Sequence, residues 1–393
     1  MKTISFHNFT KLKPLNRFLL PLILNMVILN VLSQPVCTQF GTIPPTSTGK
    51  QLGMAGPITA ILNDKLIIIG GSNFPDDYPW NKGKKKLLNE VHIGSLTEKN
   101  KIDWIDENNY TFPVAFFNGL SATVNSSIFV FGGITNNGIN NIVYRIKFDD
   151  KNRLKFDSIS TLPANFTPTA CGWIDNTILI HGYNIVENIM YRFDVNTYSW
   201  TPEKGLPGEV RTESIVSAMA GIPGNEKFYL FGGRHVTATK LSIFNDCWVY
   251  SPTKNEWQYV GEMKINSTKL TLMAAPVLLL DDTKLVFFGG DDGVSFKKRF
   301  ELEQQIKNAT GNQKTQLEMQ LREEFTSHKG FSSSILVFDT QKNRWYNAGS
   351  ISNELLPVCT SALRWRDKIL IPTGEIKPGI RSAKVLEIKL IEN

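Results

Sequence analysis

A short apolar run that ends in a glycine pair recurs along the chain, and this repeat limits the folds that the sequence can adopt. Four copies keep both glycines: LIIIGG ends at Gly71, IFVFGG at Gly133, FYLFGG at Gly233 and LVFFGG at Gly290. Two weaker copies, ILIHG and ILIPTG, end at Gly182 and Gly374 and bring the count to six. Repeats of about 50 residues indicate a stack of similar units.

Each repeat unit has the strand pattern of a propeller blade. An alternating run precedes the glycine run, and a second strand-like run follows it, as in NEVHI and DCWVY. In most units a turn and an aromatic residue then open a further strand, at Trp104, Phe156, Trp200, Trp257 and Trp345. A lone four-stranded sheet cannot bury both faces, so such units stack as blades around an axis. This is the kelch pattern, and it predicts an all-β fold, a six-bladed β-propeller.

The two ends of the chain are expected to complete one blade. The sixth unit stops after its third strand, and residues 38–48 have the pattern of the missing outer strand, with Phe40 at the aromatic position. We therefore expect the N-terminal strand to close the ring as the outer strand of the last blade. Residues 34–393 would then form one complete propeller domain.

A basic segment followed by an apolar run opens the chain and has the features of a secretory signal peptide. The run, residues 18–32, is interrupted by Pro21, Asn25 and Asn30 and is too short to span a bilayer comfortably. We expect residues 1–33 to be a signal peptide that is cleaved before Gln34, leaving an exported, periplasmic protein with no membrane attachment. An uncleaved anchor is the alternative.

The charge and the metal-binding residue types exclude several functions. The net charge of +7 falls to +3 when Lys2, Lys11, Lys13 and Arg17, which precede the apolar run, are set aside. So small a surplus argues against nucleic acid as a partner. The four cysteines and five histidines are dispersed and lack the spacing of a metal site, so we expect neither a metal nor another cofactor.

Two insertions depart from the repeat. Residues 296–326, in the fifth blade, carry apolar side chains four positions apart and predict two amphipathic helices joined near Gly311. These helices either decorate the surface of their blade or cap one end of the ring. Residues 72–88, in the first blade, contain a lysine run that forms either a solvated turn or the rim of a pocket.

Strand direction predicts which side chains share one end of the propeller. Because successive strands are antiparallel, residues after each glycine pair and residues before each innermost strand emerge at the same end. This set comprises Asp76, Asp77, Arg211, Glu213, Arg234, His235, Asp291, Asp292, Glu375, Lys377 and Arg381. Arginine binds carboxylates through a planar fork and carboxylates move protons, so such a mouth suits a small anionic sugar or acid. Ion pairing within the set is the alternative, and turn chemistry alone explains the aspartates.

The most specific motif is GEIKPGIR, residues 374–381. Its Pro378-Gly379 pair predicts a tight turn that holds Glu375 and Arg381 at the same loop base. Together with the helical insertion and the first-blade stretch GGSN…KGKKKLLNEVHI, the motif resembles the bacterial N-acetylneuraminate epimerases, the sialic acid mutarotases. The resemblance covers essentially the whole chain after the leader. It is closest to the cyclically permuted group, because the motif lies in the last blade here and mid-chain in the epimerases.

The resemblance implies an isomerase that interconverts the α- and β-anomers of N-acetylneuraminate by general acid–base catalysis, without a cofactor. Glu375 is implied as the proton acceptor and Arg381 as the ligand of the sugar carboxylate. Arg211 or Arg234 is a second candidate for that carboxylate, and a water or His235 is the implied acid. Lys377 is a further candidate for substrate binding. Glu213 is a rival base, or else an ion-pair partner of Arg211 or Arg381.

Two other classes of function use the same fold. A non-catalytic kelch module would bind a glycan or a protein partner, because a fold does not determine a function. A copper-radical sugar oxidase needs a cysteine, a tyrosine and two histidines brought together, and the sequence does not place them suitably. The exact sugar and the oligomeric state, a homodimer included, are left open by the sequence.

Overall fold

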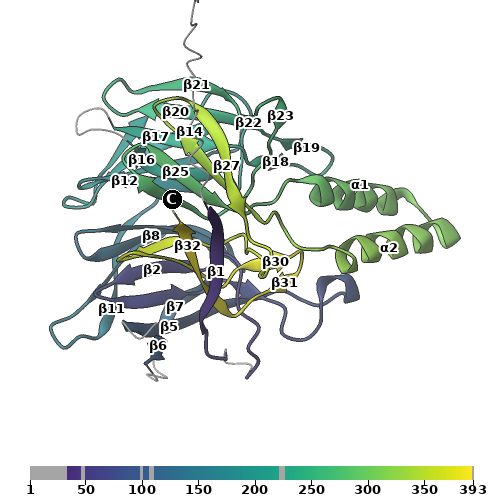
Figure 1. Ribbon diagram of the computed structural model, residues 1–393, viewed down its shortest axis with the longest axis horizontal. Coiled ribbons are helices and arrows are strands. Elements are labelled where there is room, and N and C mark those ends of the chain that lie inside the picture. Colours follow the sequence, from purple (N-terminus) through teal and green to yellow (C-terminus); the bar gives the residue numbers. More distant parts are fainter. Residues whose placement is uncertain (1–32, 46–48, 98–100, 106–109, 221–225, 392–393) are drawn as a thin grey trace, which may run out of the picture.

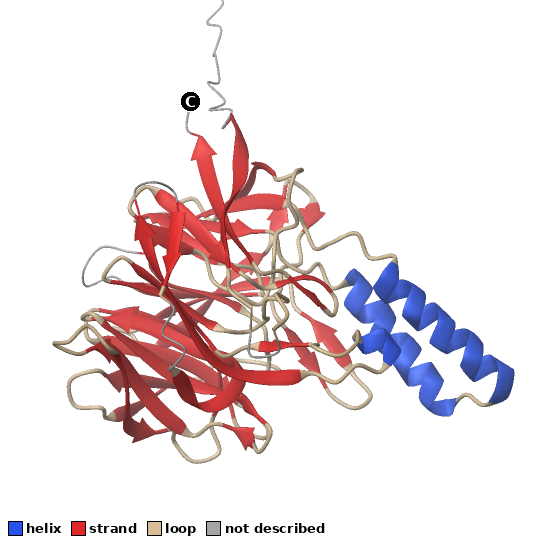
Figure 2. Ribbon diagram, turned by 90° about the horizontal axis from the view of Figure 1, so that it is seen from below, coloured by secondary structure: helices blue, strands red, loops and turns tan. Residues whose placement is uncertain are grey.

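Antiparallel sheets arranged around an axis make up the computed structural model, an all-β propeller with two α-helices at one edge (Figures 1 and 2). The structure describes residues 33–45, 49–97, 101–105, 110–220 and 226–391. The expected signal peptide lies outside these ranges except for its last residue, so export to the periplasm stays a prediction.

Four of the sheets have four strands each, in the antiparallel layout of a blade. The first comprises β12 (Thr167–Ile174), β13 (Thr177–Tyr183), β14 (Asn188–Asp194) and β15 (Trp200–Glu203). The second comprises β16 (Ile215–Ala220), β17 (Lys227–Phe231), β20 (Asp246–Ser251) and β21 (Glu256–Glu262). The third comprises β24 (Val277–Asp281), β25 (Lys284–Phe288), β26 (Ser334–Asp339) and β27 (Arg344–Ser350). The fourth comprises β28 (Leu363–Trp365), β29 (Lys368–Pro372), β32 (Lys384–Ile391) and β1 (Ser33–Thr42).

The strands of the first two repeat units are joined in one ten-stranded sheet, where we expected two separate sheets. One unit contributes β2 (Ile58–Leu62), β3 (Lys65–Ile69), β4 (Ser72–Asn73), β5 (Lys86–Thr97) and β6 (Lys101–Trp104). The other contributes β7 (Thr111–Val124), β8 (Ser127–Thr135), β9 (Gly138–Ile139), β10 (Ile142–Phe148) and β11 (Leu154–Thr161). The units join because β5 and β7 are long: β5 pairs with β3 and β6 over its second half, and its first half pairs with β7.

The core lies between neighbouring sheets and is built from the repeated apolar runs. Phe231 of β17 meets Phe287 of β25 with ring centroids 5.0 Å apart, and Phe287 meets Trp345 of β27 at 4.8 Å. All three side chains are buried. The aromatic residue that opens the outer strand therefore packs across the gap to the adjoining sheet, which explains why the repeat keeps a large apolar ring there.

The N-terminal strand closes the last sheet in the position expected from the sequence. β1 pairs with β32 antiparallel, from Ser33 opposite Ile391 to Thr42 opposite Lys384. Cys37 and Phe40 of β1 are buried. The sheet is thus formed by segments from the two ends of the described chain, which lie side by side in Figure 1.

The helical insertion lies between β25 and β26, as expected for the fifth repeat unit. It comprises α1 (Val294–Asn308) and α2 (Gly311–Thr326), which form a hairpin that projects from the edge of the β-structure (Figure 2). Its base adjoins two small hairpins, β18 (Arg234–Val236) with β19 (Leu241–Ile243) and β30 (Glu375–Lys377) with β31 (Ile380–Arg381) (Figure 1). Another small hairpin pairs β22 (Lys264–Ile265) with β23 (Thr268–Lys269). Within the described ranges, no helix has the length and hydropathy that a membrane span requires.

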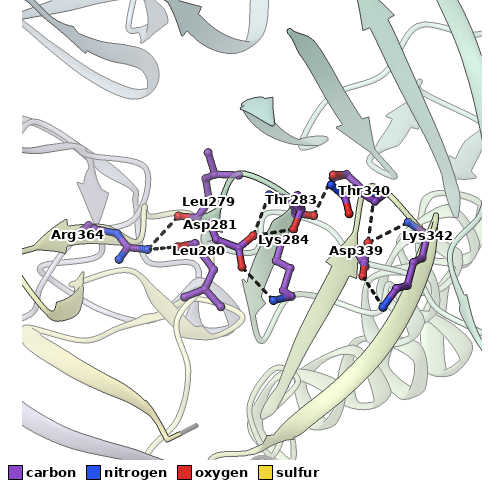
Figure 3. A network of polar contacts seen from close by, with 10 residues as sticks. Leu279, Leu280, Asp281, Thr283, Lys284, Asp339, Thr340, Lys342 and Arg364 are labelled. Carbon is purple, nitrogen blue, oxygen red and sulfur yellow. Dashed lines mark hydrogen bonds and ion pairs between the residues drawn. The ribbon is translucent and has the colours of Figure 1, made fainter. Parts of the chain in front are cut away.

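Polar side chains stabilise the turns at the end of the propeller where β24 leads into β25 (Figure 3). Asp281, in the β24–β25 turn, accepts hydrogen bonds from the backbone N–H and the hydroxyl of Thr283, both at 2.8 Å. Arg364 of β28 donates to the carbonyl oxygens of Leu279 and Leu280 at 3.0 and 2.9 Å. These contacts fix one sheet against the next. The candidate site lies at the other end of the propeller.

Candidate active site

The GEIKPGIR motif forms the tight hairpin that its sequence predicts. Glu375 of β30 lies opposite Arg381 of β31, and Gly379 supplies the turn with a φ of +83°. The backbone N–H of Gly379 donates a hydrogen bond of 2.6 Å to Glu375 Oε1, and Arg381 Nη1 donates one of 3.1 Å to the same oxygen. Two donors therefore fix the orientation of this carboxylate.

Arg381 is occupied largely by protein groups. Besides its contact with Glu375, its Nε donates a 3.3 Å hydrogen bond to the carbonyl oxygen of Ser72, and its guanidinium lies 4.8 Å from the ring centroid of Phe74. Only 5% of the side chain is exposed. The geometry makes Arg381 first a positioning residue for Glu375.

Backbone bridges place four side chains at equivalent positions around one end of the propeller. Ser72, Arg234, Asp291 and Glu375 each follow a glycine run, and each pairs with a residue that precedes an innermost strand. The predicted convergence of the residues after the glycine runs is therefore observed for these four. We call this end of the propeller the mouth.

A chain of backbone hydrogen bonds links successive repeat units just inside the mouth. Asn118 N–H donates to Gly56, Gly56 to Cys359, Cys359 to Ala274, and Ala274 to Glu213, over 2.8 to 3.2 Å. All five residues have a left-handed backbone, with φ from +51° to +66°. That conformation costs a non-glycine residue roughly 1–2 kcal/mol. At this level Glu213 and Cys359 line a central cavity of about 730 Å³.

Glu213 forms an ion pair with Arg234, in which Nη2 lies 2.5 Å from Oε1. This corrects the expectation that Arg211 or Arg381 would be its partner. Burial raises the pKa of Glu213; Arg234 opposes that shift, and the nearby carboxylates of Asp291 and Glu375 add to it. Glu213 and Glu375 therefore act on each other through space, and Glu213 is the acid whose proton is held more tightly than usual.

The aspartates divide into one buried acid and several turn residues. Asp291 is buried and accepts a 2.9 Å hydrogen bond from the backbone N–H of Gly293. Burial raises the pKa of Asp291, while that hydrogen bond and the charges of Arg234 and Arg299 oppose the shift. Asp292 accepts from the N–H of Val294 at the start of α1, and Asp77 accepts from Tyr78 and Asn81. Turn chemistry accounts for these last two.

Arg211 does not join the other arginines. Its guanidinium binds the carboxylate of Asp246 through two hydrogen bonds of 2.6 and 3.1 Å and lies 4.0 Å from the ring centroid of Phe244. The residue is 2% exposed. Arg211 is thus a buried structural cation of the β17–β20 region, and we withdraw it as a ligand of the sugar carboxylate.

His235 and Lys377 lie on the small hairpins beside the mouth. His235 Nδ1 lies 2.7 Å from the carbonyl oxygen of Val210, so this ring nitrogen is occupied by the backbone. Lys377 is half-buried in β30 and pairs with Ile380 across the hairpin. The structure gives neither side chain a contact with Glu375 or Glu213, and both remain candidates from sequence alone.

Two cations near the mouth were not singled out by sequence reasoning, which had named the first-blade lysine run only as a solvated turn or the rim of a pocket. Lys85 belongs to the first-blade lysine run; its Nζ lies 4.4 Å from the ring centroid of Phe117. The pKa of Lys85 is lowered by the surrounding protein and by the charge of Arg381, while Glu375, Cys359 and Glu213 oppose that shift, although the residue is exposed to solvent. Arg299 comes from α1 and is buried. The only signal for it was the three-residue spacing from Phe296, which places both on one helix face.

The site offers acid–base groups and cations. Within the described ranges there is no group of three or more histidine, cysteine, aspartate or glutamate side chains placed to hold a metal ion. Two carboxylates with different surroundings, each beside an arginine, can take up and release protons next to a bound anion.

Comparison with known proteins identifies one family. The family model for N-acetylneuraminate epimerase matches residues 160–393, more than half of the chain. The N-acetylneuraminate epimerase of Salmonella typhi is 25% identical over 216 residues, which cover 54% of this chain and 53% of that protein. The enzyme of that name from Yersinia enterocolitica is 27% identical over 225 residues, covering 55% and 53%. The chain thus matches about half the length of these curated relatives.

Proposed function

The chain belongs to the N-acetylneuraminate epimerase family, and we propose that it is an isomerase that interconverts the α- and β-anomers of N-acetylneuraminate. The substrate would be a small acidic sugar bound at the mouth. The observation that carries the proposal is the Glu375 carboxylate, held by Gly379 and Arg381 within electrostatic reach of a second carboxylate, Glu213.

The reaction requires the sugar ring to open and to close again on the other face. A base removes the proton of the anomeric hydroxyl, the bond between the anomeric carbon and the ring oxygen breaks, and an acid gives a proton to that oxygen. The open chain then rotates, and the reverse steps close the ring. Acid–base assistance of this kind is worth about 10² to 10⁴ in rate.

The surroundings of the two glutamates support different roles for them. Glu375 is the proposed base because its carboxylate accepts two hydrogen bonds and is held in a fixed orientation. Glu213 is the proposed acid because burial raises its pKa above the ordinary value for glutamate, a shift that its ion pair with Arg234 opposes. We prefer it to His235, whose Nδ1 is engaged by the Val210 carbonyl oxygen, so that only Nε2 of that ring could give a proton.

The test is proton NMR of freshly released α-N-acetylneuraminate at a pH where spontaneous anomerisation is slow. We expect wild type to speed conversion to the β-anomer and Glu375→Gln to lose about 10² to 10⁴ of that acceleration. Glu354→Gln is the matched control, because Glu354 pairs with Lys384 of β32 and takes no part in the proposed chemistry.

Two results would contradict parts of this proposal, the first the enzyme activity and the second the assignment of the base. If wild type gives no acceleration but binds the sugar or another glycan, the propeller is a non-catalytic binding module. If Glu375→Gln is as fast as wild type, the base is another group and Glu213 becomes the first residue to replace.

We also propose that the ten-stranded sheet counts as two blades, which gives a six-bladed ring. The antiparallel orders β2-β3-β5-β6 and β7-β8-β10-β11 within it match the order in the four separate sheets. The pairing of β5 with β7 rests on Leu88 opposite Phe116 and Glu90 opposite Thr111.

A further inference from the structure

Arg299 is delivered to the mouth by the helical insertion. It lies one turn after Phe296 in α1, and Phe296 stacks beneath Arg234, whose Cζ is 3.5 Å from the ring centroid. Arg299 Cζ lies 5.7 Å from the same ring and 5.0 Å from that of Phe325 in α2. Two aromatic rings of the hairpin base therefore hold two guanidinium groups near each other.

Arg299 differs from the other arginines of this region in its ion pairing. Arg211 pairs with Asp246, Arg234 with Glu213, and Arg381 with Glu375. The hydrogen bond given for Arg299 runs from Nη1 to the neutral hydroxyl of Ser295, at 2.9 Å. Among the residues that the structure describes, no carboxylate lies within ion-pair distance of it.

The burial of Arg299 makes that difference significant. The residue is 9% exposed, and burying a guanidinium without a counter-ion is costly. Asp291 and Glu375 are near enough to favour its charge, while Arg234 opposes it and burial lowers the pKa of Arg299. Glu324 of α2 also favours the charge of Arg299, but its carboxylate is paired with Lys298 at 2.6 Å and accepts a hydrogen bond from the Ser295 hydroxyl.

We propose that Arg299 and Arg234 form the subsite for the carboxylate of the acidic sugar, and that the bound substrate supplies the missing counter-ion of Arg299. This inference rests on the proposed function. It moves the main carboxylate ligand from Arg381, which is engaged by Glu375 and Ser72, to an arginine on the helical insertion. The insertion then contributes directly to the preference for an anionic sugar.

Calorimetric titration of the full chain with N-acetylneuraminate and with its neutral methyl ester tests the subsite. We expect Arg299→Gln to weaken binding of the acid roughly tenfold to a hundredfold, and to leave binding of the ester nearly unchanged. Arg299→Lys keeps the charge but loses the planar fork, so it should fall between the two. The matched control is Lys297→Gln on the exposed face of α1, whose ion pair with Glu301 is fully at the surface.

The outcomes separate this inference from the proposed function. If Arg299→Gln binds acid and ester with the same ratio as wild type, the subsite assignment is wrong even though the sugar binds. If wild type binds neither, the proposed function fails, and stabilisation by sulfate in a thermal melt then decides the subsite alone. Sulfate stabilisation that is lost in Arg299→Gln supports an anion subsite, and equal stabilisation of both proteins overturns it.

Discussion

The chemistry at the mouth depends on how each charged side chain is neutralised. Glu375 is held by a backbone N–H and an arginine. Glu213 is half-buried, has a positive φ and pairs with Arg234, and its surroundings raise its pKa. The two glutamates thus have different surroundings, which suits the separate base and acid roles that we propose for them. Arg211 illustrates the contrary case, in which a buried pair serves only the fold.

Replacing Arg211 by methionine should lower stability and spare substrate binding. Asp246 would lose both hydrogen bonds from the guanidinium and keep the one from Trp248 Nε1 at 2.7 Å. Breaking a buried pair by removing one partner costs about 3–5 kcal/mol, which urea denaturation would measure. Lys101→Met, which removes an exposed pair with Asp103, should change the free energy of unfolding by about 0.5 kcal/mol or less. A raised KM in folded Arg211→Met would restore Arg211 as a substrate ligand.

The sequence predicted the pairing of charged side chains that are close together in the chain. It did not predict the partners of side chains that are far apart in the chain. The Glu375 and Arg381 pairing follows from one tight turn, so GEIKPGIR was sufficient to predict it. The partner of Arg211 is 35 residues away and that of Arg234 is 21 residues away, and strand direction alone does not choose among several rim carboxylates. Arg299 was missed, and Lys85 was not singled out from its lysine run, because each stands in a charged stretch that resembles an ordinary solvated surface.

At the level of elements, the insertions support the GEIKPGIR hairpin from outside. Trp80, in the first-blade insertion, stacks on Tyr78 with centroids 4.6 Å apart and meets Phe325 of α2 at 5.8 Å. A Cβ on Gly379 would come within 2.5 Å of Pro79. The turn that carries the Glu375 contact is thus packed directly against the first-blade insertion, which in turn contacts the helical hairpin.

Gly379→Ala should therefore impair both stability and rate more than an equivalent change elsewhere. Alanine at a positive φ costs roughly 1–2 kcal/mol. At Gly379 the clash with Pro79 adds to this cost and shifts the N–H that binds Glu375. Gly138→Ala is the matched control, because Gly138 has a φ of +105° and nothing within 4 Å of its would-be Cβ. Equal losses in urea denaturation, with anomerisation rates unchanged in both variants, would contradict the proposed support.

The sequence predicted the position of the helical insertion and its two helices. Its role was left open, because helix periodicity does not show in which direction the helices leave the propeller. Helices were expected over residues 296–326 with a break near Gly311, and they span Val294–Asn308 and Gly311–Thr326. The hairpin projects outward (Figure 1). Near its base, the ring of Phe296 lies against the guanidinium groups of both Arg234 and Arg299. The projecting part thus matches the predicted surface decoration (Figure 2).

For the whole molecule, the glycine runs predicted where individual strands lie better than how those strands divide into sheets. Each glycine run ends the strand next to the innermost one, and the residues that determine this position are close together in the sequence. Whether two units remain separate depends on strand length beyond the shared core, as in the 12-residue β5 and the 14-residue β7. Closure by β1 was predictable because it required only one aromatic position, Phe40, to match the repeat.

Because β1 completes the last sheet, we predict that one of its side chains, Phe40, stabilises the neighbouring sheet as well as its own. Phe40 is 6% exposed, its ring lies 6.1 Å from that of Trp365, and it packs in one cluster with Leu66 and Ile68 of β3. Phe40→Ala should lower the free energy of unfolding by about 3–5 kcal/mol in urea denaturation, because the cavity opens between two sheets.

Val36→Ala, on the same strand, is the control: Val36 is 43% exposed, so it should cost about 0.5 kcal/mol. Hydrogen exchange in Phe40→Ala should also quicken in both β32 and β3, since both border the seam. Faster exchange in β1 alone, with stability near that of Val36→Ala, would mean that β1 is a loosely attached edge and that the ring does not depend on it.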